Sequence, residues 1–217
     1  KKLWKAGLLC GIPLFLACNL QQMGLVDTDA GKSGFLTAMY IVIVPVFGLF
    51  MRKKMSVTLP ISVVLSVIGL YLLSCAGVSK MQISDMLLIG CAFMFALQII
   101  CVEKFADDID PLRLNLLQAL VCAILSSVIA LFTEKPTIGS IFDCWLPLCY
   151  TGFLSMGAAY ALQIMGQKDL DSAPAALIMS LESVFAALFG WILLGQKMSG
   201  REILGCVIMF AAIILAQ

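Results

Sequence analysis

The distribution of charge along this chain leaves few folds open. Every Lys, Arg, Asp and Glu except Glu182 lies in, or at the edge of, a short segment between long apolar stretches. Glu182 alone stands in the middle of such a stretch. A charge at the centre of a bilayer costs about 2.5 to 3.5 kcal/mol on insertion scales, so an isolated acid there marks a pathway or a site unless it has a structural partner. The pattern predicts a polytopic membrane protein with a polar interior.

Composition supports the same class. Hydrophobic residues make up 62% of the chain, charged residues make up 12%, and the mean hydropathy is +1.05. Soluble domains contain roughly 45 to 50% apolar and about 25% charged residues. The net charge is +1, and the longest basic cluster is Arg52, Lys53 and Lys54. Because nucleic-acid binding needs many contacts to phosphates, we expect no nucleic-acid partner.

The chain has nine cysteines and no histidine. The cysteines lie within or at the ends of apolar stretches, except Cys144 at an interface, and no CxxC occurs. Since zinc and iron sites need clustered thiolates or imidazoles, we predict buried apolar cysteines, no metal and no cofactor. No Ser-His-Asp set, nucleotide loop or paired catalytic carboxylate is present, so we do not expect an enzyme.

About 20 mainly apolar residues cross a hydrocarbon core as a helix. Cutting the chain at its polar breaks gives eight such segments: 6–24, 34–51, 58–77, 86–102, 114–132, 145–166, 173–194 and 202–217. The fold class predicted is therefore all-α, a transmembrane bundle of about eight helices. Connections of about ten residues or fewer leave no room for a soluble domain.

Two kinds of residue predict local features of these helices. The small residues of Gly7-x-x-x-Gly11 and Ser155-x-x-x-Ala159 favour close helix packing. Pro13 and Pro45 predict kinks in the first and second segments.

Positive charge predicts the orientation. Nine Lys and Arg residues fall on the side of the N-terminus and five on the other, so we expect a cytoplasmic N-terminus in an inner or plasma membrane. The opening segment could also be a cleaved signal sequence, with Lys1, Lys2 and Lys5 as its basic region and Cys18 in a lipoprotein-like site. We favour a spanning helix because the segment takes part in an internal repeat.

The repeat appears when the chain is shifted by 142 positions. The matching pairs are Leu20 and Leu162, Gln21 and Gln163, Met23 and Met165, Gly24 and Gly166, Asp27 and Asp169, Asp29 and Asp171, Val42 and Val184, Phe47 and Phe189, and Gly48 and Gly190; one further residue of shift pairs Met55-Ser56 with Met198-Ser199. The first three segments thus correspond to the last three. Because equivalent segments are five apart, the copies should cross the membrane in opposite senses, as in secondary transporters with a site near the midplane.

Residues Leu181 to Ser199, LESVFAALFGWILLGQKMS, resemble a family pattern of Leu-Glu-Pro-Val, a Gly, then Gly-Glu and a small polar residue before the last helix. The pattern is that of the EamA type within the drug/metabolite transporter superfamily. The step Asp110-Pro111, with Gln118 in the following segment, supports the resemblance. It covers essentially the whole chain and is specific for the superfamily rather than for a substrate.

The resemblance implies ten helices in two inverted five-helix halves around a central cavity. Our eight segments match helices three to ten, so the first two helices would be missing ahead of Lys1. Residues 1–77 would form a partial N-terminal half of three helices, and residues 84–217 a C-terminal half of five. Ser183 replaces the family's Pro, which predicts a less kinked helix around Glu182, and Gln196 replaces the usual Glu.

Polar side chains within the apolar segments should face the bundle interior, because lipid offers them no partners. Glu182 lies about ten residues into its segment, near the midplane, where it could couple protons, contact substrate, or be tied to a neighbouring helix by hydrogen bonds. For Gln163, hydrogen bonding between helices is the main alternative to a substrate contact. The candidate substrate or coupling residues are Glu182, Gln163, Gln21, Asn19, Tyr160, Tyr40, Gln98 and Gln118. Tyr40 occupies the repeat position of Glu182.

These features predict a secondary transporter that moves a small metabolite or drug-like solute by alternating access, with proton coupling as an extension. The alternative is a non-transporting membrane fragment or interaction subunit that needs partner helices. Expected partners are the lipid bilayer, a small-molecule solute and protons. The sequence leaves a homodimer open.

Overall fold

The computed structural model describes residues 2–28, 30–52, 56–74, 82–133, 138–195 and 198–216. All regular structure in these ranges is helical: α1 (Lys2–Leu25), α2 (Ala30–Thr37), α3 (Tyr40–Phe50), α4 (Thr58–Ser74), α5 (Ile83–Ala106), α6 (Pro111–Thr133), α7 (Ile138–Asp143), α8 (Trp145–Cys149), the π-helix η1 (Tyr150–Ala159), α9 (Tyr160–Gln167), α10 (Ser172–Met179), α11 (Leu181–Leu194) and α12 (Gly200–Ala216). Ten residues that belong to the repeat, to the resemblance, or to the counts of cysteine and of Lys and Arg lie outside these ranges: Lys1, Asp29, Lys53, Lys54, Met55, Cys75, Lys80, Lys135, Gln196 and Lys197.

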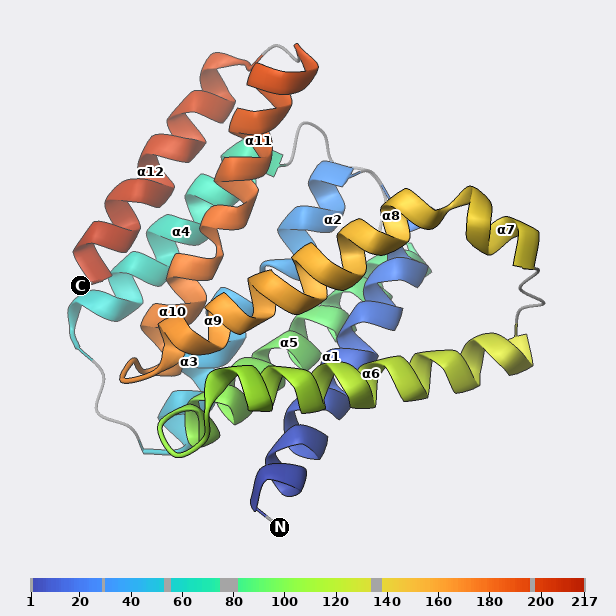
Figure 1. Cartoon of the computed structure of the whole chain (residues 1–217). Coiled ribbons are helices and arrows are strands. Elements are labelled where there is room, and N and C mark those ends of the chain that lie inside the picture. Colours follow the sequence, from blue (N-terminus) through green and yellow to red (C-terminus); the bar gives the residue numbers. More distant parts are fainter. Residues whose placement is uncertain are drawn as a thin grey trace.

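Each predicted segment contains a helix or a run of helices, which confirms the all-α fold (Figure 1). Six are long and apolar enough to cross a membrane: Lys2–Leu25, Lys32–Phe50, Ile83–Ala106, Pro111–Thr133, Trp145–Gln167 and Ser172–Leu193. The other two, α4 and α12, have 17 residues each. The chain is therefore a polytopic helical bundle, and within the described residues six of its eight predicted segments are long and apolar enough to span a membrane.

Three close helix pairings organise the bundle. Helix α1 packs against both α5 and α6, and α4 packs against α12. A Cβ atom added at Gly7 would lie 2.6 Å from Leu117 Cβ, and one at Gly11 would lie 2.7 Å from Val121 Cβ, so these glycines let α1 approach α6. A Cβ atom at Gly205 would lie 2.6 Å from the Gly69 carbonyl oxygen, which explains how α12 approaches α4. The predicted packing role of Gly7 and Gly11 is confirmed.

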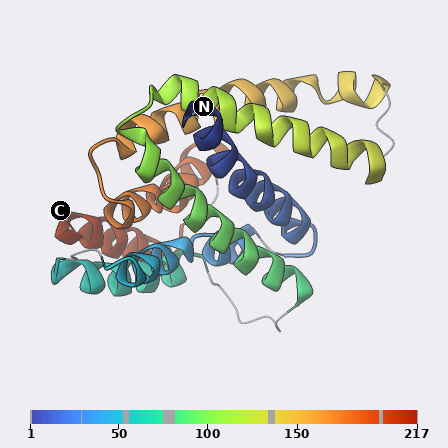
Figure 2. The ribbon, with the colours of Figure 1, turned by 90° about the horizontal axis from the view of Figure 1, so that it is seen from below.

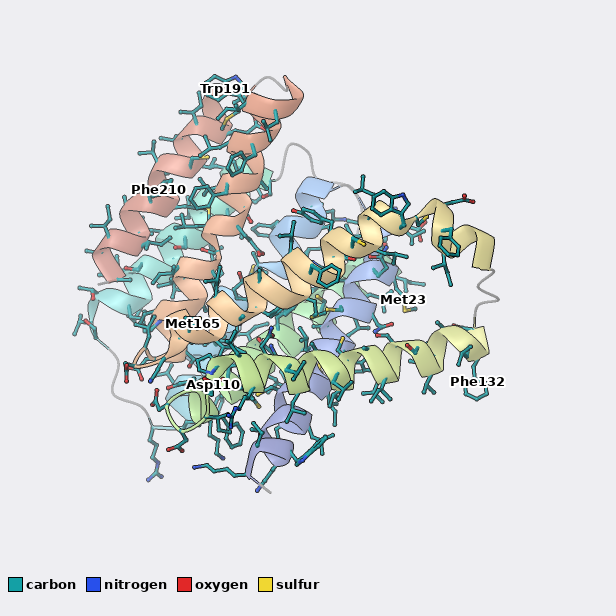
Figure 3. All side chains as sticks on the ribbon, viewed as in Figure 1. Met23, Asp110, Phe132, Met165, Trp191 and Phe210 are labelled. Carbon is teal, nitrogen blue, oxygen red and sulfur yellow. The ribbon has the colours of Figure 1, made fainter. Side chains whose placement is uncertain are left out.

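The largest cluster of buried apolar side chains lies where α3, α4, α5, α10 and α12 meet. Large apolar side chains also cover the outside of the bundle: Phe132, Trp191 and Phe210 are 87%, 53% and 40% exposed (Figure 3). A soluble protein would bury such residues, whereas a bilayer solvates them.

The far ends of α6 and of the α8–η1 run extend beyond the rest of the bundle (Figure 2). Only 17% of the spanning window in Pro111–Thr133 and 11% of that in Trp145–Gln167 is buried inside the protein. The corresponding value for α1 is 39%. This part of the structure therefore has the least covered helix faces.

Segments that the repeat pairs run in opposite directions. In Figure 1 the chain ascends through α4 and descends through the adjacent α12. It likewise ascends through α1 and descends through η1 and α9, and it descends through α2 and α3 but ascends through α10 and α11. These directions support the predicted inverted repeat, whereas the boundaries at residues 1–77 and 84–217 remain a prediction.

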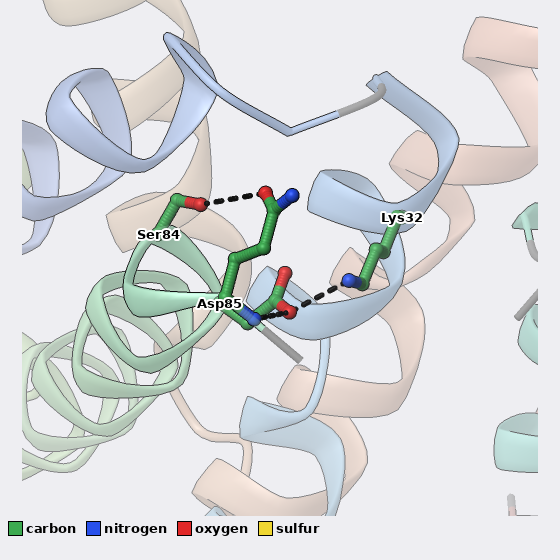
Figure 4. A network of polar contacts seen from close by, with 4 residues as sticks. Lys32, Ser84 and Asp85 are labelled. Carbon is green, nitrogen blue, oxygen red and sulfur yellow. Dashed lines mark hydrogen bonds and ion pairs between the residues drawn. The ribbon is translucent and has the colours of Figure 1, made fainter. Parts of the chain in front are cut away.

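An ion pair joins the start of α2 to the start of α5 (Figure 4). Lys32 Nζ lies 2.6 Å from Asp85 Oδ2, and the two side chains are 21% and 2% exposed. The same carboxylate oxygen accepts the backbone N–H of Gln82 at 2.8 Å, within a capping box. The contact fixes one end of α5 against the first repeat copy.

Candidate functional site

A polar cavity of about 370 Å³ lies inside the bundle. Its walls come from helices of both repeat copies and from α5. The lining residues are Gln21, Thr37, Tyr40, Phe95, Gln98, Ile99, Ser155, Ala159, Tyr160, Gln163, Met179 and Glu182. Six of the eight residues predicted from the sequence thus meet around one space: Glu182, Gln163, Gln21, Tyr160, Tyr40 and Gln98.

Two breaks in the spanning helices help to shape this cavity. Helix α2 ends at Thr37 and α3 begins at Tyr40, while α10 ends at Met179 and α11 begins at Leu181. The 142-residue shift relates Ala30–Thr37 to Ser172–Met179, so α2 and α10 have the same length and the same repeat position. Broken helices at membrane depth are tolerated where they line a cavity, and they are typical of transporter sites.

Local hydrogen bonds account for the second break. The Ser180 hydroxyl donates to the Leu177 carbonyl at 2.6 Å, and the Ser180 N–H reaches the carbonyls of Ala176 and Leu177 at 3.1 and 3.2 Å. A serine that bonds to the preceding turn in this way competes with regular helix hydrogen bonding. The interruption comes at Ser180, three residues before the position at which the resemblance places a Pro, and the smaller kink at Ser183 stays a prediction.

The first break also differs from the prediction. Pro45 lies inside α3, as Pro13 lies inside α1. The interruption falls earlier, at Ala38 and Met39, where the Met39 N–H donates to the Leu36 carbonyl at 3.3 Å in a tightened turn. The sequence signal used, proline, missed both breaks.

Glu182 stands in the first turn of α11 and lines the cavity. Its side chain is exposed to this space, and no side chain in the described ranges donates a hydrogen bond to its carboxylate. Within the described ranges, no hydrogen bond supports the alternative in which Glu182 is tied to a neighbouring helix.

A chain of side-chain amides leads from the cavity into the protein. Gln163 Nε2 donates to Gln98 Oε1 at 3.2 Å, and Gln98 Nε2 donates to Gln118 Oε1 at 3.3 Å. Gln118 Nε2 then donates to Asn115 Oδ1 at 3.0 Å. Gln163 also donates to Gln167 Oε1 at 3.3 Å. These bonds orient the two amides that line the cavity, Gln98 and Gln163.

The amide chain ends on the π-helix. Asn115 Nδ2 donates to the carbonyls of Met156 and Gly157 at 3.1 and 2.9 Å. A π-helix departs from α-helical hydrogen bonding, and such segments occur often at functional sites. Ser155 and Ala159, for which the sequence predicts close helix packing, also line the cavity from this helix. No feature of the sequence pattern predicted η1.

Two predicted site residues lie outside the cavity lining. Asn19 Nδ2 donates to the Phe15 carbonyl at 2.8 Å and to Ser126 Oγ at 3.4 Å, so it joins α1 to α6. Gln118 is fully buried and lies one amide behind the cavity, bonded to Gln98. Both are placed as contacts between helices.

Six lining residues were not predicted, and the repeat contains the signal for two of them. Thr37 and Met179 are related by the 142-residue shift, as are Gln21 and Gln163, and Tyr40 and Glu182. Three repeat-related pairs therefore face one cavity. Phe95, Ile99, Ser155 and Ala159 carry no polarity or pairing that would have singled them out.

A second cavity, of about 540 Å³, lies near the α5–α6 connection. Its lining includes Glu103, Lys104, Asp107, Asp169 and Asp171. The Asp169 N–H donates to Asp107 Oδ1 at 3.1 Å, which links this connection to that between α9 and α10. Within the described ranges, no three His, Cys, Asp or Glu residues are grouped to hold a metal ion.

A bundle of apolar helices with a polar interior cavity and broken helices is the architecture of membrane transport proteins. Residues 82–216 match the EamA-like transporter family, and the chain belongs to that family. It is therefore an integral membrane protein of a transporter family, and not of an enzyme family.

Individual relatives agree with this assignment. An "Uncharacterized transporter" of Archaeoglobus fulgidus is 32% identical over 216 residues, which are 99% of this chain and 69% of that protein. "Uncharacterized transporter YoaV" of Bacillus subtilis is 23% identical, over 94% of this chain and 74% of its own length. A known crystal structure superposes with a TM-score of 0.80 at 17% identity, covering 98% of this chain and 76% of the other, which shows the fold alone.

Proposed function

We propose that this protein is a secondary carrier that moves a small organic solute across the membrane by alternating access. The observation that supports this most directly is the composition of the cavity, where Gln21 faces the same space as its repeat partner Gln163, and Tyr40 the same space as Glu182. A site between inverted repeats is contacted by equivalent positions of both copies. Rocking one copy against the other can therefore open the same site to either side of the membrane.

We further propose that Glu182 couples the movement of the solute to a proton. Glu182 is the only carboxyl among the described residues that line the cavity, and it has no hydrogen-bond donor in the described ranges. The other titratable groups near it are the phenols of Tyr40 and Tyr160, which line the same cavity, and the thiol of Cys91 in α5. A carboxyl whose access alternates between the two sides can take up a proton on one side and release it on the other.

The test is a flux measurement in vesicles that contain the purified protein. A panel of small organic solutes, including cations, anions and neutral compounds, is offered with and without a pH gradient. We expect uptake of at least one solute, faster with the gradient. Replacing Glu182 by Gln should abolish the dependence on the gradient, because the amide keeps the shape of the side chain but cannot be protonated at neutral pH.

Glu103→Gln is the matched control, since it makes the same chemical change at a residue outside the cavity. It should leave the flux unchanged. Both variants should insert in the membrane and elute from size exclusion as the wild type does. Gradient-dependent flux that persists in Glu182→Gln would remove this residue from coupling, and no flux of any solute would contradict the carrier.

A second candidate function is supported by the thinly covered helices. Helix α1 is packed by α5 and α6, whereas its repeat equivalent Trp145–Gln167 has only 11% of its spanning window buried. Further helices packed against Trp145–Gln167 would correspond to α5 and α6 around α1, and so would complete the symmetry between the two repeat copies. In this second candidate the chain is an interaction subunit that transports only with partner helices. Flux through the purified chain as a monomer would contradict it.

We also propose that the N-terminus faces the cytoplasm and that the protein lies in the inner or plasma membrane. The support is the excess of Lys and Arg on the N-terminal side, nine against five. A single cysteine introduced next to Lys2, in a variant without the native cysteines, should resist a membrane-impermeant thiol reagent in intact cells. Labelling of this cysteine in intact cells would show instead that the N-terminus faces the outside.

A further inference from the structure

Among the described residues, the lining of the cavity carries one kind of formal charge. Glu182 contributes a carboxylate, and none of the described residues that line the cavity is Lys or Arg. A carboxylate without a basic partner favours a positively charged ligand. A second carboxylate placed beside it would be repelled, so the same feature discriminates against anions.

Aromatic rings form part of the same wall. Tyr40, Phe95 and Tyr160 line the cavity with Glu182, and the rings of Tyr40 and Phe95 meet edge to face at 6.5 Å. The face of an aromatic ring attracts a cation, and this attraction is strongest where water is excluded. Tyr40 is 4% exposed, so the protein holds its ring in place.

The remaining lining suits an organic group rather than a hydrated metal ion. Ile99 and Met179 add apolar surface, while Gln21 and Gln163 offer amide donors and acceptors. The Thr37 hydroxyl is buried at the cavity and bonds to no oxygen or nitrogen of the described residues. A volume of about 370 Å³ falls within the range of small-molecule sites, about 300 to 1,000 Å³.

We propose that the solute is an organic cation, an ammonium group attached to a small apolar or aromatic body. The ammonium binds at the carboxylate of Glu182 and the ring of Tyr40. The body packs between Ile99 and Met179. This inference rests on the proposed carrier function and names the chemical class of its solute.

The test uses two probes of similar shape and opposite charge. Trimethyl(2-phenylethyl)ammonium is permanently positive, and 3-phenylpropionate is negative at neutral pH. Binding to the purified protein in lipid nanodiscs is measured by calorimetry, without any gradient. We expect the ammonium to bind and the carboxylate not to bind at the same millimolar concentrations.

Variants assign the binding to the cavity. Glu182→Gln should weaken binding of the ammonium by about tenfold or more, because a charged contact is lost. Tyr40→Leu should weaken it by about threefold or more, because the ring is lost. Glu103→Gln should leave it unchanged. Equal binding of the two probes, tighter binding of the carboxylate, no binding of the ammonium, or ammonium binding unaffected by Glu182→Gln would each overturn the proposal.

Equilibrium binding and vesicle flux separate this inference from the carrier function. If the ammonium binds at Glu182 but no solute crosses the membrane, the cation site stands and the carrier function fails. If a neutral or anionic solute is carried while the ammonium does not bind, the carrier function stands and the cation class is wrong.

Discussion

Gln98 shows how one buried amide can serve both the packing of helices and the lining of the cavity. Its side chain is fully buried, and it accepts a hydrogen bond from Gln163 while donating one to Gln118. Gln163 is half-buried and lies at the cavity end of this chain of amides. We therefore expect Gln98 to contribute more to the stability of the fold than Gln163 does.

This difference gives a prediction about stability. Gln98→Ala should lower the free energy of unfolding by about 1 to 2 kcal/mol, because Gln118 Oε1 loses its donor, Gln163 Nε2 loses one of its two acceptors, and a void opens. Gln163→Ala should cost less, since its amide reaches the cavity. Thermal unfolding in detergent, followed by tryptophan fluorescence, measures both.

Solute binding to the same variants tests the role of Gln163. The sequence left open whether Gln163 contacts the solute or only joins helices. If it contacts the solute, Gln163→Ala weakens binding while the protein remains stable. A loss of stability equal to that of Gln98→Ala, with unchanged binding, would make it a packing residue.

Individual helices approach each other most closely where glycine replaces a side chain. Helices α4 and α12 meet at Gly69 and Gly205, and both positions lack room for a Cβ atom. Gly166 lies in α9 with nothing within 4 Å of an added Cβ atom. Substitutions at Gly205 and at Gly166 therefore distinguish the effect of close helix packing from the effect of helix propensity.

Gly205→Ala should destabilise the protein by about 1 to 3 kcal/mol, because its methyl group would meet the Gly69 carbonyl oxygen at 2.6 Å. Gly166→Ala is the matched control, and it should be neutral or stabilise the protein by about 0.5 to 1 kcal/mol through helix propensity. Thermal unfolding in detergent compares the two. Equal effects of both substitutions would contradict the close approach of α4 and α12.

At the scale of the whole molecule, the Lys32–Asp85 ion pair connects the first repeat copy to α5. Its Asp85 Oδ1 atom is buried and has no hydrogen-bond partner among the described residues. A buried pair of this kind stabilises little compared with an apolar pair of the same size, whereas breaking it is costly. The contact is suited to holding the relative position of two parts of the bundle.

Asp85→Ala alone should lower stability by about 2 kcal/mol, because it breaks a largely buried ion pair and removes the side chain that caps the start of α5. The double variant Lys32→Met, Asp85→Leu should recover most of this loss. Unfolding temperatures of the single and double variants in detergent provide the measurement. A double variant less stable than Asp85→Ala would show that the charges themselves hold the bundle together.

Much of the architecture followed from periodicity and polarity in the sequence. The eight segments, the interior position of Glu182 and the pairing of Gln21 with Gln163 came from apolar runs and a 142-residue shift. The structure confirms the all-α bundle and places six of the eight candidates around one cavity. These features depend on which residues lipid can solvate, and such information is local in the chain.

The breaks at Ala38–Met39 and at Ser180, and the π-helix η1, did not follow from the sequence. Each depends on where backbone groups find partners, such as the carbonyls of Met156 and Gly157 that accept from Asn115, a residue about 40 positions earlier. The positions of Phe95 and Ile99 in the cavity lining did not follow from the sequence either. Whether their apolar side chains face the lipid or the cavity depends on how α5 is rotated about its axis.

The sequence by itself determined that this protein spans a membrane, that its two ends repeat each other, and that one carboxylate remains within the apolar stretches. Hydrophobic free energy is nearly additive over residues, so it can be read along a chain. Only the tertiary structure decided which polar groups share a space and which hold helices together. Hydrogen bonds and cavity walls join residues far apart in sequence, and their geometry is fixed only when the helices pack.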